Sequence, residues 1–185
     1  MHDDVARILL SRETIRQRVA ALATEVVAAS AGRDDGLTFV PILSGSIVFL
    51  ADLIREMPVH MRLALVHLST YRGTQAGQPR IVADLSHDVR GRHVIIVDDI
   101  LDTGRTLTFV RDMLAQREPA SVRICVLLRK PGKAPASLHA DFVGFDIADE
   151  FVVGYGLDYN DLYRNLPHIG VLRAECIAAA AQPPR

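Results

Sequence analysis

The sequence predicts an α/β fold with a doubly wound, mainly parallel sheet, flanking helices and a small C-terminal hood. Apolar runs of strand length alternate with segments whose apolar residues recur at helical spacing, which is the pattern of a parallel sheet. The alternation stops after residue 145. We therefore expect the later residues to fold back over the strand ends, with the functional site between sheet and hood.

Length and composition fit a single domain over residues 1–185, with 49% hydrophobic and 23% charged residues. Within it we expect a core over about 8–145, a hood mainly over 146–172 with an N-terminal contribution, and a frayed tail over 174–185. A formal net charge of −1 gives no reason to expect binding to nucleic acid or to an anionic membrane surface.

Compartment and cysteine usage point to an ordinary intracellular protein. The first residues are acidic and no basic segment precedes an apolar run, so we expect a cytoplasmic location. No apolar stretch has the length of a membrane span. Cys125 and Cys176 have neither metal-type nor redox-type spacing, and Cys125 is expected to be a small buried hydrophobe.

The first half of the chain is predicted from apolar spacing and from turn residues. Ser11 can cap a helix whose apolar face recurs from Ile15 to Val26. The expected elements are this helix, ending by Gly32, a buried strand over 37–43, a turn at 44–46, a helix from 47 that ends before Pro58, a strand over 62–68, a polar loop over 70–79 and a short strand over 81–85.

The second half continues the alternation and then breaks it. The expected elements are a buried strand from His93, a helix with Leu107, Val110 and Leu114 on one face, a buried strand over 122–128, a turn at 130–133, and short strands over 141–145 and 151–154 around a break at 149–150.

The most informative segment is residues 93–106, His-Val-Ile-Ile-Val-Asp-Asp-Ile-Leu-Asp-Thr-Gly-Arg-Thr. It predicts a buried strand, an acidic loop and a helix N-terminus. Free amides and threonine hydroxyls there can bind phosphate, and Asp98 with Asp99 can accept from a vicinal diol, so the loop suits a ribose 5-phosphate. The alternative is an acidic surface turn. Against it, the aspartates stand directly at the end of an apolar strand, and the turn has no lysine or glutamate.

This segment resembles the phosphoribosyl-diphosphate (PRPP) motif of the type I phosphoribosyltransferases. Three later segments resemble the hypoxanthine-guanine phosphoribosyltransferases: 141–145, Asp-Phe-Val-Gly-Phe; 151–160, Phe-Val-Val-Gly-Tyr-Gly-Leu-Asp-Tyr-Asn; and 163–167, Tyr-Arg-Asn-Leu-Pro. With Thr70-Tyr71 and the strand end at 127–130, the resemblance runs from about Ile8 to Leu172.

The resemblance implies transfer of the ribosyl group of PRPP to N9 of hypoxanthine or guanine, which gives IMP or GMP and diphosphate with Mg²⁺ as cofactor. It implies a catalytic base, Asp102, that accepts the purine N7 proton. The implied ribose-phosphate site is Asp98, Asp99, Asp102, Thr103, Gly104, Arg105 and Thr106. The implied diphosphate site is Ser44, Gly45, Thr70, Tyr71 and Arg164. The implied purine site is Lys130, Phe151, Val152 and Asp158, and the metal candidates are Asp158, Asp98 and Asp99.

Several residues admit a plainer interpretation from sequence alone. Phe151 could belong to the core, Lys130 could be a solvated turn residue, and Asp158 with Arg164 could form a surface ion pair. Two other functions stay open at this point: a PRPP-binding regulator without catalysis, and a transferase for another base such as xanthine, adenine or a pyrimidine. The resemblance also implies a homodimer or homotetramer.

Two positions depart from the family pattern. Ser44 stands where many members have lysine, in a loop that often holds a non-proline cis peptide. Asp98 stands where many have glutamate, which keeps the carboxylate but shortens its reach. We expect the Ser44 loop still to bind diphosphate through its backbone amides, with one positive charge fewer nearby.

Overall fold

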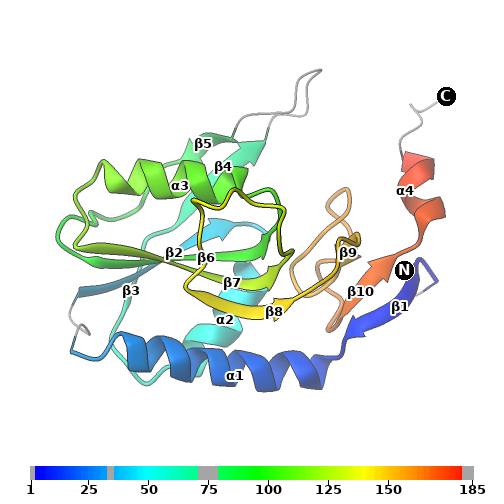
Figure 1. Ribbon diagram of the computed structural model, residues 1–185, viewed down its shortest axis with the longest axis horizontal. Helices are drawn as coiled ribbons and strands as arrows, with labels where there is room; N and C mark the ends of the chain where they lie inside the picture. Colours follow the sequence, from blue (N-terminus) through cyan, green and yellow to red (C-terminus); the bar gives the residue numbers. More distant parts are fainter. Residues whose placement is uncertain (1–2, 33–35, 71–78, 181–185) are drawn as a thin grey trace.

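The computed structural model describes residues 3–32, 36–70 and 79–180 of the chain. They form a core around one large sheet, and a smaller sheet beside it that carries both ends of the chain (Figure 1). Within these residues no helix combines the length and the apolar character needed to cross a bilayer.

The core sheet has the strand order β5-β4-β2-β6-β7-β8, and β3 pairs with β2 beside β4. The strands are β2 (Leu37–Leu43), β3 (Arg62–Leu63), β4 (Val66–Thr70), β5 (Pro79–Ala83), β6 (His93–Leu101), β7 (Ser121–Arg129) and β8 (Phe142–Asp146). All pair in parallel except β4 with β5. The chain winds outward from β2 to one side and from β6 to the other, so the order reverses between them.

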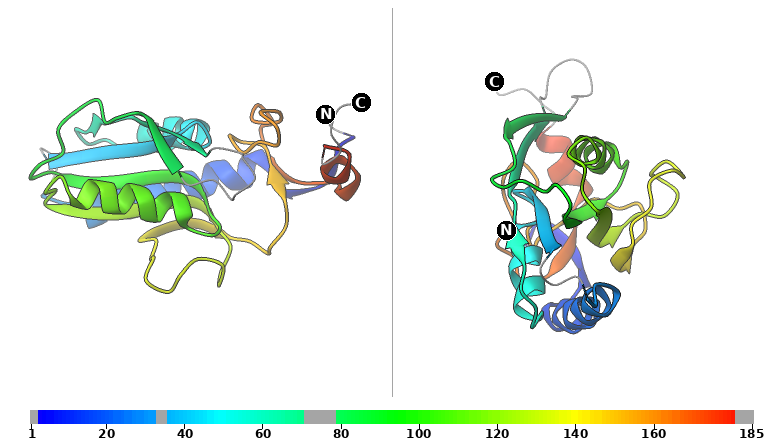
Figure 2. Two further views of the ribbon diagram at one scale, coloured as in Figure 1. Left: turned by 90° about the horizontal axis from the view of Figure 1, so that it is seen from above. Right: turned by 90° about the vertical axis from the view of Figure 1, so that its left-hand side faces the viewer.

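Helices cover both faces of this sheet (Figures 1 and 2). Helix α1 (Arg12–Ala29) and α2 (Ile47–Arg55) lie on one face, and α3 (Arg105–Ala115) lies on the other. Alternation along β6 explains the two layers: Ile95 and Val97 pack with α1 and α2, whereas Val94 and Ile96 pack with α3.

The hood is a three-stranded antiparallel sheet in the order β1-β10-β9, made of β1 (Val5–Leu10), β10 (Ile169–Leu172) and β9 (Val152–Val153). Its strands come from N-terminal and C-terminal parts of the chain, because β1 pairs with β10. Helix α4 (Ala174–Ala180) follows, and its Ile177 packs in the cluster around Val153 and Leu166.

Most predicted elements are present, and Ser11 caps α1 by accepting from the amide of Thr14 at 3.1 Å. Three expectations were wrong. The strand expected over 62–68 is divided, because β3 pairs with β2 at Thr38 and Phe39 while β4 pairs at Ile42 and Leu43. Asp98 and Asp99 were expected in an acidic loop after the strand. They lie inside β6 instead, because β7 stays paired with β6 as far as Leu101.

The third is the tail, which was expected to fray over 174–185. Residues 174–180 form α4, because Cys176 and Ile177 contact the hood and the carbonyl of Ile177 accepts from the hydroxyl of Tyr159 at 3.0 Å. The expected loop over 70–79 lies mostly outside the described residues, and so does Tyr71.

Candidate active site

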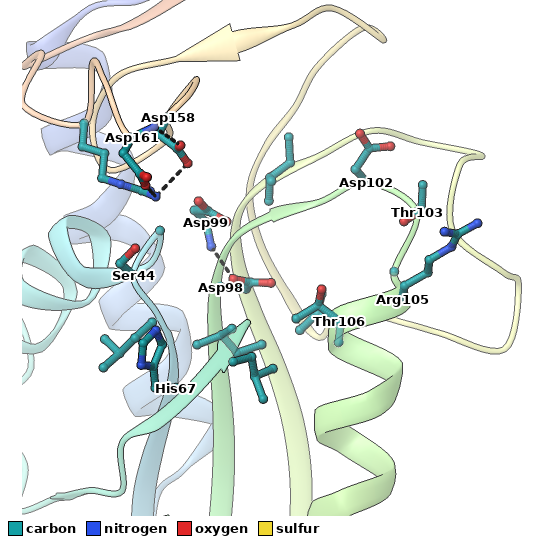
Figure 3. Close-up of a pocket in the computed structure, with 18 residues that line it drawn as sticks. Ser44, His67, Asp98, Asp99, Asp102, Thr103, Arg105, Thr106, Asp158 and Asp161 are labelled. Atoms are coloured by element: carbon teal, nitrogen blue, oxygen red, sulfur yellow. Dashed lines mark hydrogen bonds and ion pairs between the residues drawn. The ribbon is translucent and has the colours of Figure 1, made fainter. Parts of the chain in front are cut away.

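A cavity of about 780 Å³ opens where β2 and β6 separate (Figure 3). Their ladder ends at the pair Pro41 and Val97, after which β2 continues beside β4 and β6 continues beside β7. This is the carboxyl end of the sheet at its point of reversal, where α/β proteins bind ligands. Most of the predicted residues line it: Ser44, Gly45, Asp98, Asp99, Asp102, Thr103, Gly104, Arg105, Thr106, Asp158 and Arg164.

The floor of the cavity carries the acidic pair of β6. Asp98 is 7% exposed, and its Oδ1 accepts from the backbone amide of Asp99 at 3.1 Å. Burial, and then the charge of Asp99, raise the pKa of Asp98 well above its usual range. Burial also raises the pKa of Asp99, although the charge of Arg164 opposes this shift. Burial therefore disfavours the ionised form of both carboxyl groups, and a bound cation or hydroxyl donors can stabilise that form.

The turn from β6 into α3 offers donors to a phosphate. Gly104 has φ +72°, and a Cβ there would lie 2.5 Å from Leu138 Cδ2, so glycine is required by both conformation and space. No side chain caps α3, so the first amides of the helix stay available, and Thr103 and Thr106 place hydroxyl groups beside them. The turn can hold a phosphate monoester.

Across the cavity from the turn into α3, the Ser44 loop packs against the hood. The Leu43–Ser44 peptide bond is cis. A Cβ on Gly156 would lie 2.3 Å from the carbonyl oxygen of Gly45, so the hood backbone rests directly on this loop. Arg164 donates from Nη1 to the carbonyl of Gly156 at 2.7 Å, and its Nη2 lies 2.8 Å from Asp158 Oδ1. A guanidinium is thus held at the cavity wall, where it suits an anionic ligand.

Asp102 and Lys130 form the core of a charged cluster at the edge of the cavity. Lys130 Nζ lies 3.2 Å from Asp102 Oδ2 and 3.0 Å from Asp149 Oδ1. Lys133 Nζ lies 3.4 Å from Asp102 Oδ1 and 2.7 Å from Asp149 Oδ2. Among the described residues, Asp102 Oδ1 is the buried side-chain oxygen that accepts no hydrogen bond. Lys130 is buried, which excludes the solvated-turn interpretation.

The hood supplies the remaining predicted residues. Phe151 is 41% exposed, with its ring edge-to-face against Tyr159 at 5.3 Å, so it is not a core residue. The amide of Leu172 donates to the carbonyl of Phe151. By the alternation of an antiparallel ladder, the N–H and C=O of Val152 then point away from β10, toward the free edge of the hood sheet.

Sequence reasoning missed four residues of the site. His67 and Asp161 line the cavity, and Lys133 and Asp149 complete the cluster around Asp102. His67 pairs with Leu43 in the parallel ladder, so its place beside the Ser44 loop depends on strand register, which no local pattern reveals. Thr70 is the last residue of β4, and its side chain lies outside the described residues, as does Tyr71.

Comparisons with known proteins agree with this geometry. The family model described as "Phosphoribosyl transferase domain" matches residues 7–160. Hypoxanthine-guanine phosphoribosyltransferases from Streptococcus pneumoniae and Staphylococcus epidermidis are both 42% identical, and the alignments cover 95% of this chain and 97% and 98% of those proteins.

Solved structures give the same result. A hypoxanthine phosphoribosyltransferase from Staphylococcus aureus is 39% identical, with a TM-score of 0.89 and coverage of 95% of this chain and 96% of that one. The Trypanosoma cruzi enzyme, a mutant complexed with the product IMP, is 36% identical, with a TM-score of 0.92 and 99% coverage of both chains. The chain therefore belongs to the phosphoribosyltransferase family, and within it to the hypoxanthine-guanine phosphoribosyltransferases.

Proposed function

We propose that the chain transfers the 5-phosphoribosyl group of PRPP to N9 of hypoxanthine or guanine, a purine salvage reaction that gives IMP or GMP and diphosphate. The enzyme class follows from the family: the chain is a pentosyltransferase. The roles of individual residues are proposals that rest on their geometry and on the family resemblance.

The observation that carries the substrate class is the pair formed by Lys130 and Asp102. Lys130 Nζ is a hydrogen-bond donor, and Asp102 Oδ1 is an acceptor that receives no hydrogen bond. The two groups lie side by side, because Lys130 Nζ donates to the other oxygen of the same carboxylate, Asp102 Oδ2, at 3.2 Å. A 6-oxopurine presents O6 next to N7 along one edge, and adenine presents an amino group in place of O6. A donor beside an acceptor thus fits O6 and a protonated N7, whereas lysine cannot accept from an amino group.

The remaining residues fit PRPP. The turn of Thr103 to Thr106 would hold the 5′-phosphate, and Asp98 with Asp99 would accept from the ribose hydroxyls. Ser44, Gly45 and Arg164 would hold the diphosphate, and the family resemblance also assigns Thr70 and Tyr71 to it. Phe151 would stack on the purine, and the main chain of Val152 would read its Watson–Crick edge.

The carboxylates on the floor of the cavity fit a magnesium ion. Burial raises the pKa values of Asp98 and Asp99 by disfavouring their ionised forms, so a bound cation would stabilise the two carboxylates. Asp158 accepts from Asp161 and from Arg164, so we propose that it reaches the ion through water and borders the purine pocket. When bound, Mg²⁺ neutralises charge on the diphosphate leaving group.

The proposed reaction is a substitution at C1 of the ribose. As the bond from C1 of the ribose to diphosphate breaks, positive charge develops on the ribose ring, and N9 forms the new bond from the opposite side with inversion. Asp102 Oδ1 accepts the N7 proton while Oδ2 stays bonded to Lys130. The carboxylates of the cavity face the developing cation, and the hood limits access of water to it.

A PRPP-binding regulator and a transferase for another base are the competing functions. A regulator has no need of the base, the stacking ring and the donor together, and all three are present here. Incubation with PRPP, Mg²⁺ and separate bases tests the proposal: IMP and GMP are expected, and nucleotide from adenine or orotate alone would refute it.

The location, partners and assembly of the enzyme are proposals too, and the assembly rests on the family resemblance. We infer a cytoplasmic location, small-molecule partners only, and a homodimer or homotetramer. Light scattering coupled to size exclusion tests the assembly, and a monomer at micromolar concentration would contradict it.

A further inference from the structure

Lys130 is held by two carboxylates, and only one of them belongs to the proposed reaction. Its Nζ lies 3.2 Å from Asp102 Oδ2 and 3.0 Å from Asp149 Oδ1. A lysine ammonium has three donors, so two are occupied and one is left. The side chain is 9% exposed, so protein groups rather than bulk water set the direction of the third donor.

Asp149 is itself fixed by a second cation. Lys133 Nζ lies 2.7 Å from Asp149 Oδ2, so each carboxylate oxygen of Asp149 faces its own lysine. These hydrogen bonds, with Lys133 as the larger effect, lower the pKa of Asp149 and keep it charged. Lys133 also lies 3.4 Å from Asp102 Oδ1, which closes a ring of two lysines and two aspartates.

The place of Asp149 in the chain adds a second argument. It lies two residues before Phe151, on the segment between β8 and β9 that enters the hood. The residue proposed to stack on the purine and the carboxylate that holds Lys130 therefore lie on the same short segment. The segment thus links the proposed stacking residue to the proposed donor for O6 through Asp149.

We propose that Asp149, braced by Lys133, is a positioning residue that aims the third N–H of Lys130 at purine O6 and so contributes to base specificity. This inference rests on the proposed function, because it requires Lys130 to read O6. Asp149 touches neither substrate, and it acts through Lys130.

Replacement of Asp149 with Asn tests the positioning role. Without the charge, Lys130 keeps its bond to Asp102 but loses the partner that fixes its direction. Because Asp149 is 60% exposed, the loss is modest: kcat/KM for hypoxanthine should fall about 3- to 10-fold. KM for PRPP should stay within about twofold, and the preference for hypoxanthine over adenine should narrow. Asp149→Glu should restore much of the preference.

Glu150→Gln is the matched control. Glu150 is the neighbouring carboxylate, but it pairs with Arg7 and not with the lysines, so its loss should leave purine kinetics unchanged. A Lys130→Ser, Asp149→Asn double variant should be no worse for hypoxanthine than Lys130→Ser alone, because both changes remove the same function.

The outcomes separate the two proposals. A wild type that forms no IMP would refute the proposed function. An active wild type whose Asp149→Asn variant keeps the same purine kinetics and base preference would overturn the positioning role alone. The positioning role would also be overturned if the double variant lost the product of the two single-variant losses in kcat/KM for hypoxanthine. It would be overturned as well if Asp149→Asn impaired the use of hypoxanthine and the use of PRPP to the same extent.

Discussion

At Gly45, the addition of a single methyl group should weaken the use of PRPP while leaving the stability of the fold nearly unchanged. An alanine Cβ there would lie 2.0 Å from Asp99 Oδ2 and 2.7 Å from its Cγ, whereas Cβ contacts below 3.0 Å essentially do not occur. The carboxylate of Asp99 must therefore move by about 1 Å, and a misplacement of that size can reduce activity about 10²-fold.

Most of the loss should appear in the use of PRPP, because Asp99 is proposed to bind the ribose. We expect Gly45→Ala to lower kcat/KM for PRPP by about 10²-fold, equivalent to about 2.7 kcal/mol of transition-state stabilisation. The melting temperature should change little, since Gly45 has no left-handed φ and the side chain that yields lines an open cavity.

The assay is steady-state kinetics with PRPP as the varied substrate, beside thermal unfolding of the same samples. Gly36→Ala is a matched control, because a Cβ there would lie 3.4 Å from His93 at a position without left-handed φ. A Gly45→Ala enzyme within threefold of wild type in kcat/KM for PRPP would refute the assignment of Asp99.

The other predictions concern the base, the donor, the buried acids and the Ser44 loop. Asp102→Asn should leave PRPP binding nearly intact and slow turnover by about 10²–10⁴-fold, measured under single-turnover conditions; a loss of only a few-fold in the chemical step would remove Asp102 as the base. Lys130→Ser should lower kcat/KM for hypoxanthine and guanine by about 10- to 100-fold and narrow the gap to adenine; unchanged discrimination would assign O6 to the backbone. Asp98→Asn should raise the melting temperature of the ligand-free protein at neutral pH, because the raised pKa of Asp98 means that its ionisation opposes folding; the difference should close as pH falls toward 3.8, and a destabilised variant at pH 7 would contradict the burial argument. Ser44→Lys should tighten binding of magnesium-PRPP modestly in calorimetric titration, more at low salt than at high salt, and equal affinities at both would show that this position does not face the ligand.

Local patterns were enough to predict the layers of this fold. Helical spacing from Ile15 to Val26, the Ser11 cap and the buried runs at 37–43 and 122–128 each coincide with an element of the structure. These features depend on residues close in sequence, so the sequence carries them directly.

The features that the sequence did not reveal depend on distant partners. Strand β1 exists because residues 5–10 pair with 169–172, and neither segment has a clear alternating pattern. Asp98 and Asp99 extend β6, since its neighbour β7 is long enough to pair with them. Asp149 and Lys133 are 16 residues apart with β8 between them, so their contacts with Lys130 and Asp102 had no local signal.

Lys130 and Asp102 are proposed to select a 6-oxopurine, so discrimination among bases is the decisive property to measure. The wild-type protein is incubated with PRPP, Mg²⁺ and hypoxanthine, guanine, adenine or orotate in turn, and nucleotide is followed by absorbance. IMP and GMP are the expected products. The kcat/KM for adenine should be lower than that for hypoxanthine by at least about 10²-fold, because the buried ammonium of Lys130 would face the 6-amino group of adenine, which does not accept a hydrogen bond. Adenine or orotate used as well as hypoxanthine would contradict the proposal.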